Sequence, residues 1–171
     1  MTAWLALAPL GAPASQTTDV EPPPEWDYDG VYMLVGVAPG TTVHLNGINP
    51  MLRFDTEIGM EWRRDKWAAG FGADAWMLKY LERKKVGGGL HGVVTVTRRP
   101  VYVRAGVGAL TGIPGTPDDS VFRPAVGGLV GFGLEGGGSH VTGRFGFDYH
   151  ASLDKAGRVN NTFLFAIRLK F

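Results

Sequence analysis

The chain has 171 residues, 44% of them apolar, and its 17 Lys and Arg residues nearly balance its 16 Asp and Glu residues. This length and apolar content support one folded domain, and a formal net charge of +1 lacks the basic surplus that nucleic-acid binding needs. The absence of cysteine excludes disulfides, thiolate catalysis and cysteine-ligated metals.

The first 25 residues predict a leader and a linker. A short apolar run, Ala3 to Leu10, precedes Ala12-Pro13-Ala14, which has the small-x-small form of a secretory cleavage site, so residues 1–14 are a candidate signal peptide. The Lys or Arg that usually precedes such a run is missing, which leaves an ordered N-terminal segment as the alternative. Residues 15–25 are polar and proline-rich and predict an extended linker, so the folded domain is expected to cover 26–171.

From Trp26 onward, apolar residues recur at every second position, which is the period of a β-strand. No run reaches the roughly 18 apolar residues that a membrane-spanning helix needs. The alternation and the turn residues predict strands near 29–38, 52–63, 67–80, 89–99, 101–107, 123–135, 141–150 and 159–171. The first, third and fourth of these alternate less cleanly and are assigned by spacing.

The segment from Leu52 to Arg63 shows what the alternation implies. Its two faces are Leu52, Phe54, Thr56, Ile58, Met60, Trp62 and Arg53, Asp55, Glu57, Gly59, Glu61, Arg63. One face is too apolar, and the other too charged, for a strand in a soluble core, whereas lipid outside and a polar interior suit both. The strands near 101–107, 123–135 and 141–150 repeat this division.

The links between the strands give a second indication. Those at 63–66, 98–100 and 135–140 are short, whereas those around 39–51, 81–89, 111–122 and 153–160 are mostly longer. A barrel with both termini in the periplasm has tight periplasmic turns and longer external loops. The predicted fold is therefore all-β, a closed antiparallel up-and-down transmembrane β-barrel of about eight strands.

The last strand places five apolar side chains on one face: Phe163, Phe165, Ile167, Leu169 and Phe171. Bacterial outer-membrane barrels typically finish in an amphipathic strand with a terminal aromatic residue, and FLFAIRLKF resembles that class, as found in small outer-membrane-protein-A-like and opacity-like barrels. The resemblance covers the chain from about Tyr28 by architecture, although its specific motif is these nine residues. It implies the outer membrane of a Gram-negative cell, contact with membrane lipid and lipopolysaccharide, and recognition of the last strand by the barrel-assembly machinery.

Side-chain parity also predicts functional sets. The predicted lumen charge network is Arg53, Asp55, Glu57, Glu61, Asp74, Arg104, Arg123, Glu135, Arg144, Asp148 and Arg168. Its signs nearly cancel, and an eight-stranded barrel is just wide enough for side chains to fill, so a plugged, ion-paired lumen is expected, with a narrow wet passage as the alternative. The aromatic residues predicted at the water–lipid boundaries are Trp62, Trp67, Trp76, Tyr80, Tyr102 and Tyr149.

His150-Ala151-Ser152 is the candidate catalytic element, because it is similar to the H-x-S element on the second-last strand of outer-membrane lipid A 3-O-deacylases. That family has a glutamate on its last strand, where this chain has Asn160, Asn161 and Thr162, and parity turns His150 and Ser152 inward. No catalytic residue is therefore assigned. The remaining histidines are too scattered to predict a metal site, and the glycine runs lack the Lys-Ser/Thr of a phosphate loop, so no metal or cofactor is predicted.

The sequence thus predicts a non-enzymatic barrel with a structural or interaction role. Loops around 39–51 and 111–124 are its expected contact surfaces, because rigid barrels carry variable chemistry on loops. Three alternatives remain open: a narrow pore for small solutes or ions, a lipid A-modifying membrane enzyme, and a soluble lipocalin-type barrel whose apolar face turns inward around a ligand.

Overall fold

The computed structural model describes residues 25–44, 47–82, 86–111, 125–138, 140–153, 157 and 159–171, which form eight strands. The strands are β1 (Asp27–His44), β2 (Gly47–Arg64), β3 (Trp67–Tyr80), β4 (Val86–Arg98), β5 (Val101–Thr111), β6 (Ala125–Gly137), β7 (Thr142–Leu153) and β8 (Val159–Lys170). No helix long and apolar enough to cross a membrane is found in these ranges. The predicted signal peptide (1–14) and, except for Glu25, the predicted linker (15–25) lie outside them.

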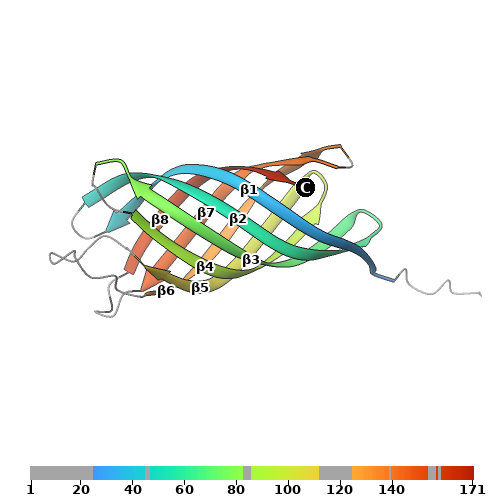
Figure 1. Ribbon diagram of the computed structural model, residues 1–171, viewed down its shortest axis with the longest axis horizontal. Helices are drawn as coiled ribbons and strands as arrows, with labels where there is room; N and C mark the ends of the chain where they lie inside the picture. Colours follow the sequence, from blue (N-terminus) through green and yellow to red (C-terminus); the bar gives the residue numbers. More distant parts are fainter. Residues whose placement is uncertain are drawn as a thin grey trace, which may run out of the picture.

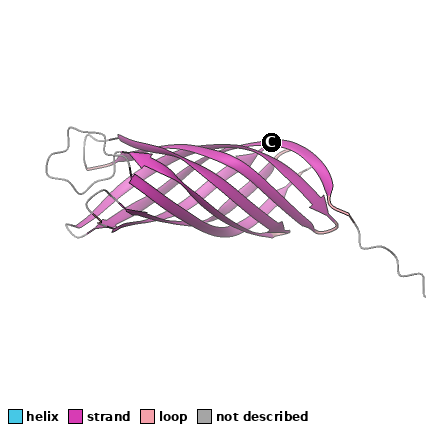
Figure 2. Ribbon diagram, turned by 90° about the horizontal axis from the view of Figure 1, so that it is seen from below, coloured by secondary structure: helices cyan, strands magenta, loops and turns pink. Residues whose placement is uncertain are grey.

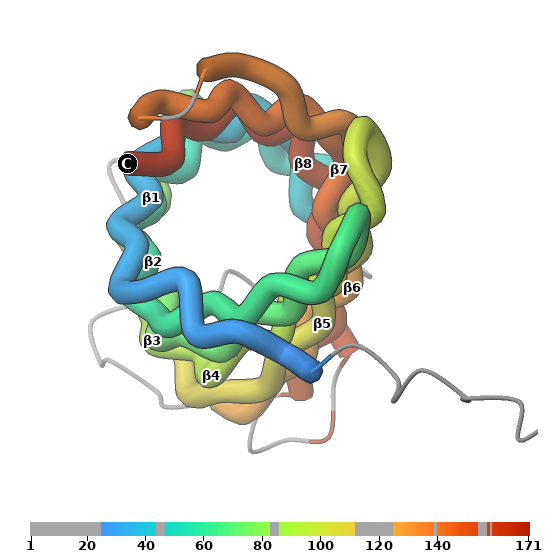
Figure 3. The backbone as a smooth tube through the Cα atoms, turned by 90° about the vertical axis from the view of Figure 1, so that its right-hand side faces the viewer, coloured from blue at the N-terminus to red at the C-terminus, as the bar shows by residue number. Residues whose placement is uncertain are grey.

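The eight strands form a closed antiparallel barrel in chain order (Figure 1). Each strand pairs with the next, and β1 closes the ring against β8, with Val35 opposite Leu169. Seen along the barrel, the backbone makes a complete ring (Figure 3). Closure pairs the strands on both sides, except where Asp27–Tyr32 of β1 extends beyond the end of β8 and where the β1–β8 ladder has a gap. The predicted fold class is confirmed.

The two ends of the barrel carry different connections (Figure 2). Both the start of β1 and the end of β8 lie at one end, which we call the terminal end, together with the links after β2, β4 and β6. The links after β1, β3, β5 and β7 lie at the opposite end, the loop end. The turn after β2 is tight, with Asp65 at a φ of 54°, a left-handed conformation that the short polar side chain of Asp tolerates better than most. The short turns predicted at the terminal end are confirmed.

The loop predicted at 39–51 is wrong. β1 continues to His44 and β2 begins at Gly47, so paired strands occupy most of that segment. Pro39 suggested a loop because proline cannot donate to a ladder. It lies where the pairing of β1 with β8 has a gap, between the Val37↔Ile167 and Gly40↔Leu164 pairs, so a residue without an N–H is tolerated there. The predicted loop 111–124 lies, except for Thr111, outside the described residues.

Side chains alternate between the lumen and the outer surface as predicted. Phe54 and Phe132 are 47% and 59% exposed on the outside, whereas Arg53 is 1% exposed within the lumen. The apolar face of β8 also points outward, with Phe163, Phe165, Ile167, Leu169 and Phe171 between 38% and 50% exposed. This arrangement is the reverse of the lipocalin-type alternative, in which the apolar face would turn inward.

Candidate functional site

A cluster of ionised side chains fills the middle of the lumen. We call it the central cluster, and its members are Arg53, Asp55, Glu57, Asp74, Arg104, Asp148 and Arg168. They come from β2, β3, β5, β7 and β8, and the side-chain exposure of each is at most 1%. Each of them stands in sequence between residues whose side chains point outward, so strand alternation turns it into the lumen.

Arg104 connects three strands through the centre of the barrel. Its Nη2 atom lies 3.1 Å from Glu57 Oε2 on β2 and 3.1 Å from Asp74 Oδ2 on β3. Arg53 Nη2 lies 2.6 Å from the same Asp74 oxygen. Since one carboxylate joins two guanidinium groups, these side chains form one connected block across the lumen.

Arg168 extends this block to the remaining strands. Its Nε donates to Asp55 Oδ2 at 2.5 Å, and its Nη2 donates to Asp148. Asp148 also lies 3.8 Å from Arg104 Nη1, which joins the two parts of the cluster. Burying an ion without a partner is very costly, so each of these groups depends on its neighbours for the ionised state.

Several atoms of the central cluster still have bonding capacity. Asp55 Oδ1, Asp74 Oδ1, Asp148 Oδ1 and Arg168 Nη1 are buried and have no hydrogen-bond partner among the described residues. Buried polar atoms are almost always bonded, to protein or to ordered water. We therefore expect these atoms to bind water molecules between the ions.

A second group of ions lies toward the terminal end. We call it the terminal cluster: Glu61, Glu135, Arg144 and Lys170. Lys170 donates to Glu61, and Arg144 Nε donates to Glu135 Oε2 at 2.6 Å. Arg63 was expected in the lumen as well, but its side chain is 43% exposed at the rim, where Nη2 lies 3.2 Å from Glu61.

Three interior aromatic side chains stand opposite glycines on the neighbouring strand. The directly paired residues are Tyr32 with Gly59, Trp76 with Gly89, and Tyr102 with Gly133. A Cβ atom built on Gly59 would lie 2.7 Å from the Tyr32 ring, and one built on Gly89 would lie 2.7 Å from the Trp76 ring. Glycine is therefore required at these two positions to give the rings room inside the barrel.

Half of the predicted interfacial aromatics are interior residues, which corrects that prediction. Trp76, Tyr80 and Tyr102 are 8%, 2% and 1% exposed. Trp76 and Tyr80 share the parity of Asp74, and Tyr102 shares that of Arg104, so strand alternation turns all three inward. Trp67 and Tyr149 do lie on the outer surface, at 45% and 39% exposure, and Trp62 is half-buried.

Two histidines lie on the loop side of the central cluster. The indole N–H of Trp76 donates to His91 Nδ1 at 2.9 Å, and Arg53 Nη1 lies 2.5 Å from His150 Nε2. Indole and guanidinium nitrogens only donate, so both ring nitrogens act as acceptors and each imidazole carries its proton on the other nitrogen. The two imidazoles, with ring centroids 5.2 Å apart, are therefore neutral.

Beyond the histidines, the lumen is lined by apolar side chains together with the buried polar side chains Thr42, Asn49, Ser152 and Asn160. The apolar part of this lining, which we call the apolar cap, is Met51, Leu78, Tyr80, Leu110 and Leu164, each at most 7% exposed. A pocket of about 20 Å³ remains between the cap and His150. A space of that size holds roughly one water molecule, so the described side chains leave almost no free space at this level of the lumen.

The candidate catalytic pair does not have the geometry of a serine hydrolase. His150 and Ser152 both point into the lumen and are 6% and 9% exposed. His150 Nε2 already accepts from Arg53, and no carboxylate bonds to His150 in the part of the chain that the structure describes. A base needs a free acceptor and an orienting group, so the lipid A-modifying alternative loses its support.

Within the described ranges, no three His, Asp or Glu side chains group as metal ligands would.

Every member of the predicted lumen charge network within the described residues is at most 4% exposed, and Arg123 lies outside those residues. Sequence reasoning missed Tyr32 and His91, which are 4% and 0% exposed. Tyr32 donates a hydrogen bond to Glu57. Its position between Val31 and Met33, which point outward, could have predicted that Tyr32 lies in the lumen. His91 could not be assigned without register, because its partner Trp76 is on another strand.

Similarity to known proteins is found at the level of structure rather than sequence. No protein-family model matches the chain. No curated protein sequence matches it either. Among solved structures, the chain is similar to the crystal structure of Neisserial surface protein A, over 84% of this chain and 99% of that chain, with 15% sequence identity and a TM-score of 0.48.

Proposed function

We propose that this protein is an integral outer-membrane β-barrel, closed to solutes, that presents its loop end to the outside of the cell. The observation that carries the proposal is the distribution of polarity across the wall. Phe132 and Phe147 are more than half exposed on the outside, while Arg104 is buried inside. An exposed apolar surface of this extent leads to association in water, whereas a closed barrel with an apolar exterior is stable in hydrocarbon.

Strand length and orientation support the membrane assignment. The strands from β3 to β8 contain 11 to 14 residues, and a tilted strand crosses a bilayer with about 9–11. The terminal end, with its tight turns, would face the periplasm, and the loop end would face the exterior. Membrane lipid and lipopolysaccharide would then contact the outer wall, and the assembly machinery would recognise the apolar face of β8.

The role that fits this barrel best is that of a structural or interaction scaffold, without catalysis. Both the central cluster and the apolar cap fill the lumen, which disfavours the pore alternative. The connections at the loop end, 112–124 among them, are the part of the chain that a rigid wall would hold toward external partners.

Membrane insertion and orientation can be tested together, because the chain has no cysteine of its own. Leu81→Cys places a thiol at the loop end, where Leu81 is 64% exposed, and Lys66→Cys places one at the exposed terminal-end turn. In intact cells, a membrane-impermeant maleimide should label Leu81→Cys and should label Lys66→Cys after permeabilisation only.

The same cells provide the test of insertion. The protein should be recovered in the outer membrane and should run differently on a gel before and after heating, as closed barrels do. Recovery in buffer without detergent would overturn the membrane assignment, and labelling of Lys66→Cys in intact cells would overturn the orientation.

A further inference from the structure

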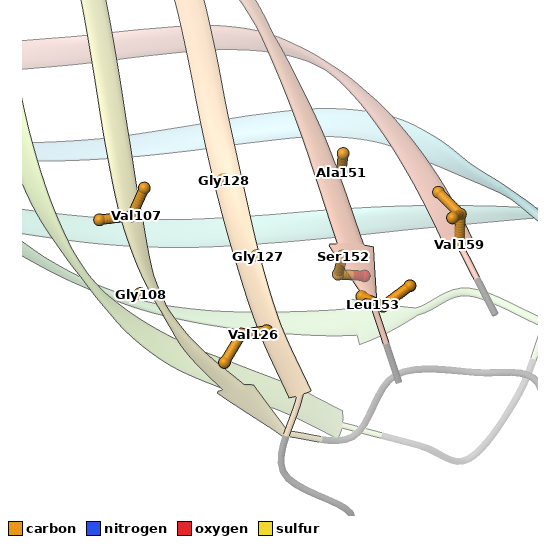
Figure 4. A pocket seen from close by; sticks show the side chains of 9 residues that line it. All are labelled: Val107, Gly108, Val126, Gly127, Gly128, Ala151, Ser152, Leu153 and Val159. Atoms are coloured by element: carbon orange, nitrogen blue, oxygen red, sulfur yellow. The ribbon is translucent and has the colours of Figure 1, made fainter. Parts of the chain in front are cut away.

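The outer wall has a hollow near the loop end, which we call the outer trough (Figure 4). Its floor is formed by Gly128 on β6 and Ala151 on β7, which are paired across the ladder. Val126, Leu153 and Val159 form the wall on the loop side. The trough has a volume of about 620 Å³, and an almost wholly apolar lining.

The absent side chain of Gly128 leaves the trough open instead of making room for a neighbour. A Cβ atom on Gly128 would have one close neighbour, the Gly106 carbonyl oxygen at 3.5 Å, which is ordinary van der Waals contact. This differs from Gly59 and Gly89 in the lumen, where a Cβ atom would collide with an aromatic ring. The hollow at Gly128 is therefore not needed for packing within the barrel.

A polar group lies beside the trough, next to its lining residue Ala151. Asn161 on β8 is the next residue in the same outward row, opposite Ala151. Its Oδ1 accepts a hydrogen bond from the Tyr149 hydroxyl at 2.7 Å, and the Tyr149 ring packs on Phe163 at a centroid distance of 5.3 Å. The bond uses the amide oxygen, and the amide N–H groups of Asn161 have no partner among the described residues, so they can donate on this largely apolar face.

An acyl ester has the chemistry that complements this arrangement. Its alkyl chain suits the apolar floor and walls, and its carbonyl oxygen suits the N–H groups of Asn161. The trough is continuous with the apolar wall and lies near the loop end, where β7 ends and β8 begins. In the proposed orientation this is the outer boundary of the bilayer, where the ester groups of outer-leaflet lipid lie.

We propose that the outer trough binds one ester-linked acyl chain of lipopolysaccharide, with Asn161 as the hydrogen-bond donor to the ester carbonyl. This inference rests on the proposed membrane orientation. It assigns a defined lipid site to β6, β7 and β8, in addition to the general contact that any barrel wall makes with lipid.

The test compares variants that fill the trough with one that adds the same bulk elsewhere on the wall. Gly128→Leu and Ala151→Leu place a side chain in the trough, and Asn161→Leu removes the donor. Ala73→Leu is the matched control, because Ala73 is an exposed small residue on the outer face of β3. Each full-length protein is extracted in mild detergent, and native mass spectrometry measures the lipopolysaccharide retained per barrel.

We expect Gly128→Leu and Ala151→Leu to lower the retained lipopolysaccharide about fivefold, Asn161→Leu to lower it less, and Ala73→Leu to match the wild type. Equal retention in all variants, or no lipopolysaccharide on the wild type, would overturn the site. Reconstitution with phospholipid alone tests the source, since equal retention of phospholipid would overturn the assignment to lipopolysaccharide. A heat-modifiable outer-membrane barrel that fails this test would leave the proposed function intact.

Discussion

The two halves of the lumen are filled by different chemistry. From the central cluster to the terminal end, the interior is held by ion pairs such as Arg168 with Asp55 and Arg144 with Glu135. Toward the loop end, it is held by apolar packing among Met51, Leu110 and Leu164. Both kinds of contact fill the same lumen. An ionic contact requires a particular partner, whereas an apolar contact requires the right side-chain volume.

This difference indicates which half of the lumen determines the register of the strands. A one-residue slip of a strand would turn its charges into the outer apolar environment and leave their partners unpaired. In the apolar cap, the same slip would exchange one apolar set for another at lower cost. The ionic half is therefore expected to fix the alignment of the strands, and the cap to add stability that depends little on which apolar residue is present.

Removal of a guanidinium from the central cluster should have the largest effect. Arg168→Met leaves Asp55 and Asp148 buried without their main cation, and we expect the free energy of unfolding in detergent to fall by about 3–5 kcal/mol. Urea titration monitored by the heat-modifiable band measures it. A change below about 1 kcal/mol would mean that the ionic half does not determine stability.

The matched control for that variant removes the carboxylates as well. The triple variant combines Arg168→Met with Asp55→Asn and Asp148→Asn. It removes the two carboxylates that Arg168 had neutralised, so a substantial part of the free energy of unfolding lost in Arg168→Met should be recovered. If the triple variant is less stable than the single one, the cost comes from lost packing and not from an unpaired charge.

The sequence was sufficient to predict that these ionic residues lie in the lumen, because each strand shows its own alternation of charged and outward-facing residues. In β2, charged Arg53, Asp55 and Glu57 alternate with large apolar residues, and that alternation alone assigns them to the lumen. The pairing of Arg168 with Asp148 and Asp55 could not be predicted in the same way. It depends on the tilt and register of strands distant in sequence, which local alternation does not encode.

Truncation in the apolar cap should have a smaller effect. Leu164 is 2% exposed among the cap residues, and Leu164→Ala leaves a cavity there without an unpaired charge. We expect a loss of about 2–3 kcal/mol, and recovery of most of it in Leu164→Met, because volume is what the cap requires. Urea titration again measures the change, and a loss larger than that of Arg168→Met would reverse the comparison between the halves.

Glycine substitution should have a still smaller effect, and it tests how the rings are held in the ionic half. A Cβ atom on Gly59 would lie 2.7 Å from the Tyr32 ring and 2.5 Å from the Phe71 carbonyl oxygen. Gly59→Ala should therefore cost about 1–2 kcal/mol, because both the Tyr32 ring and the Phe71 backbone must shift. Gly92→Ala is the control, since nothing lies within 4 Å of its Cβ position, and equal effects of the two would contradict the role of Gly59.

The aromatic residues show where sequence reasoning failed. Trp76 and Tyr102 were assigned to the water–lipid boundary by residue type, although parity with Asp74 and Arg104 places them inside. Strand alternation is the physical cause, and for Trp76 the glycine across the ladder gives the ring interior space. The facing glycine could not be predicted, because the β3–β4 register depends on a connection at the loop end and not on one of the tight turns at the terminal end.

The smallest expected effect is on ion conduction, where we expect none. In planar bilayers the wild type should be silent, and so should Leu110→Ala with Leu164→Ala, which thins the apolar cap but leaves the central cluster intact. A reconstituted open porin is the positive control. Discrete current steps from the wild type would support the pore alternative, because neither half would then close the lumen. Steps from the thinned variant alone would show that the cap is the seal and that the space between the ions is permeable.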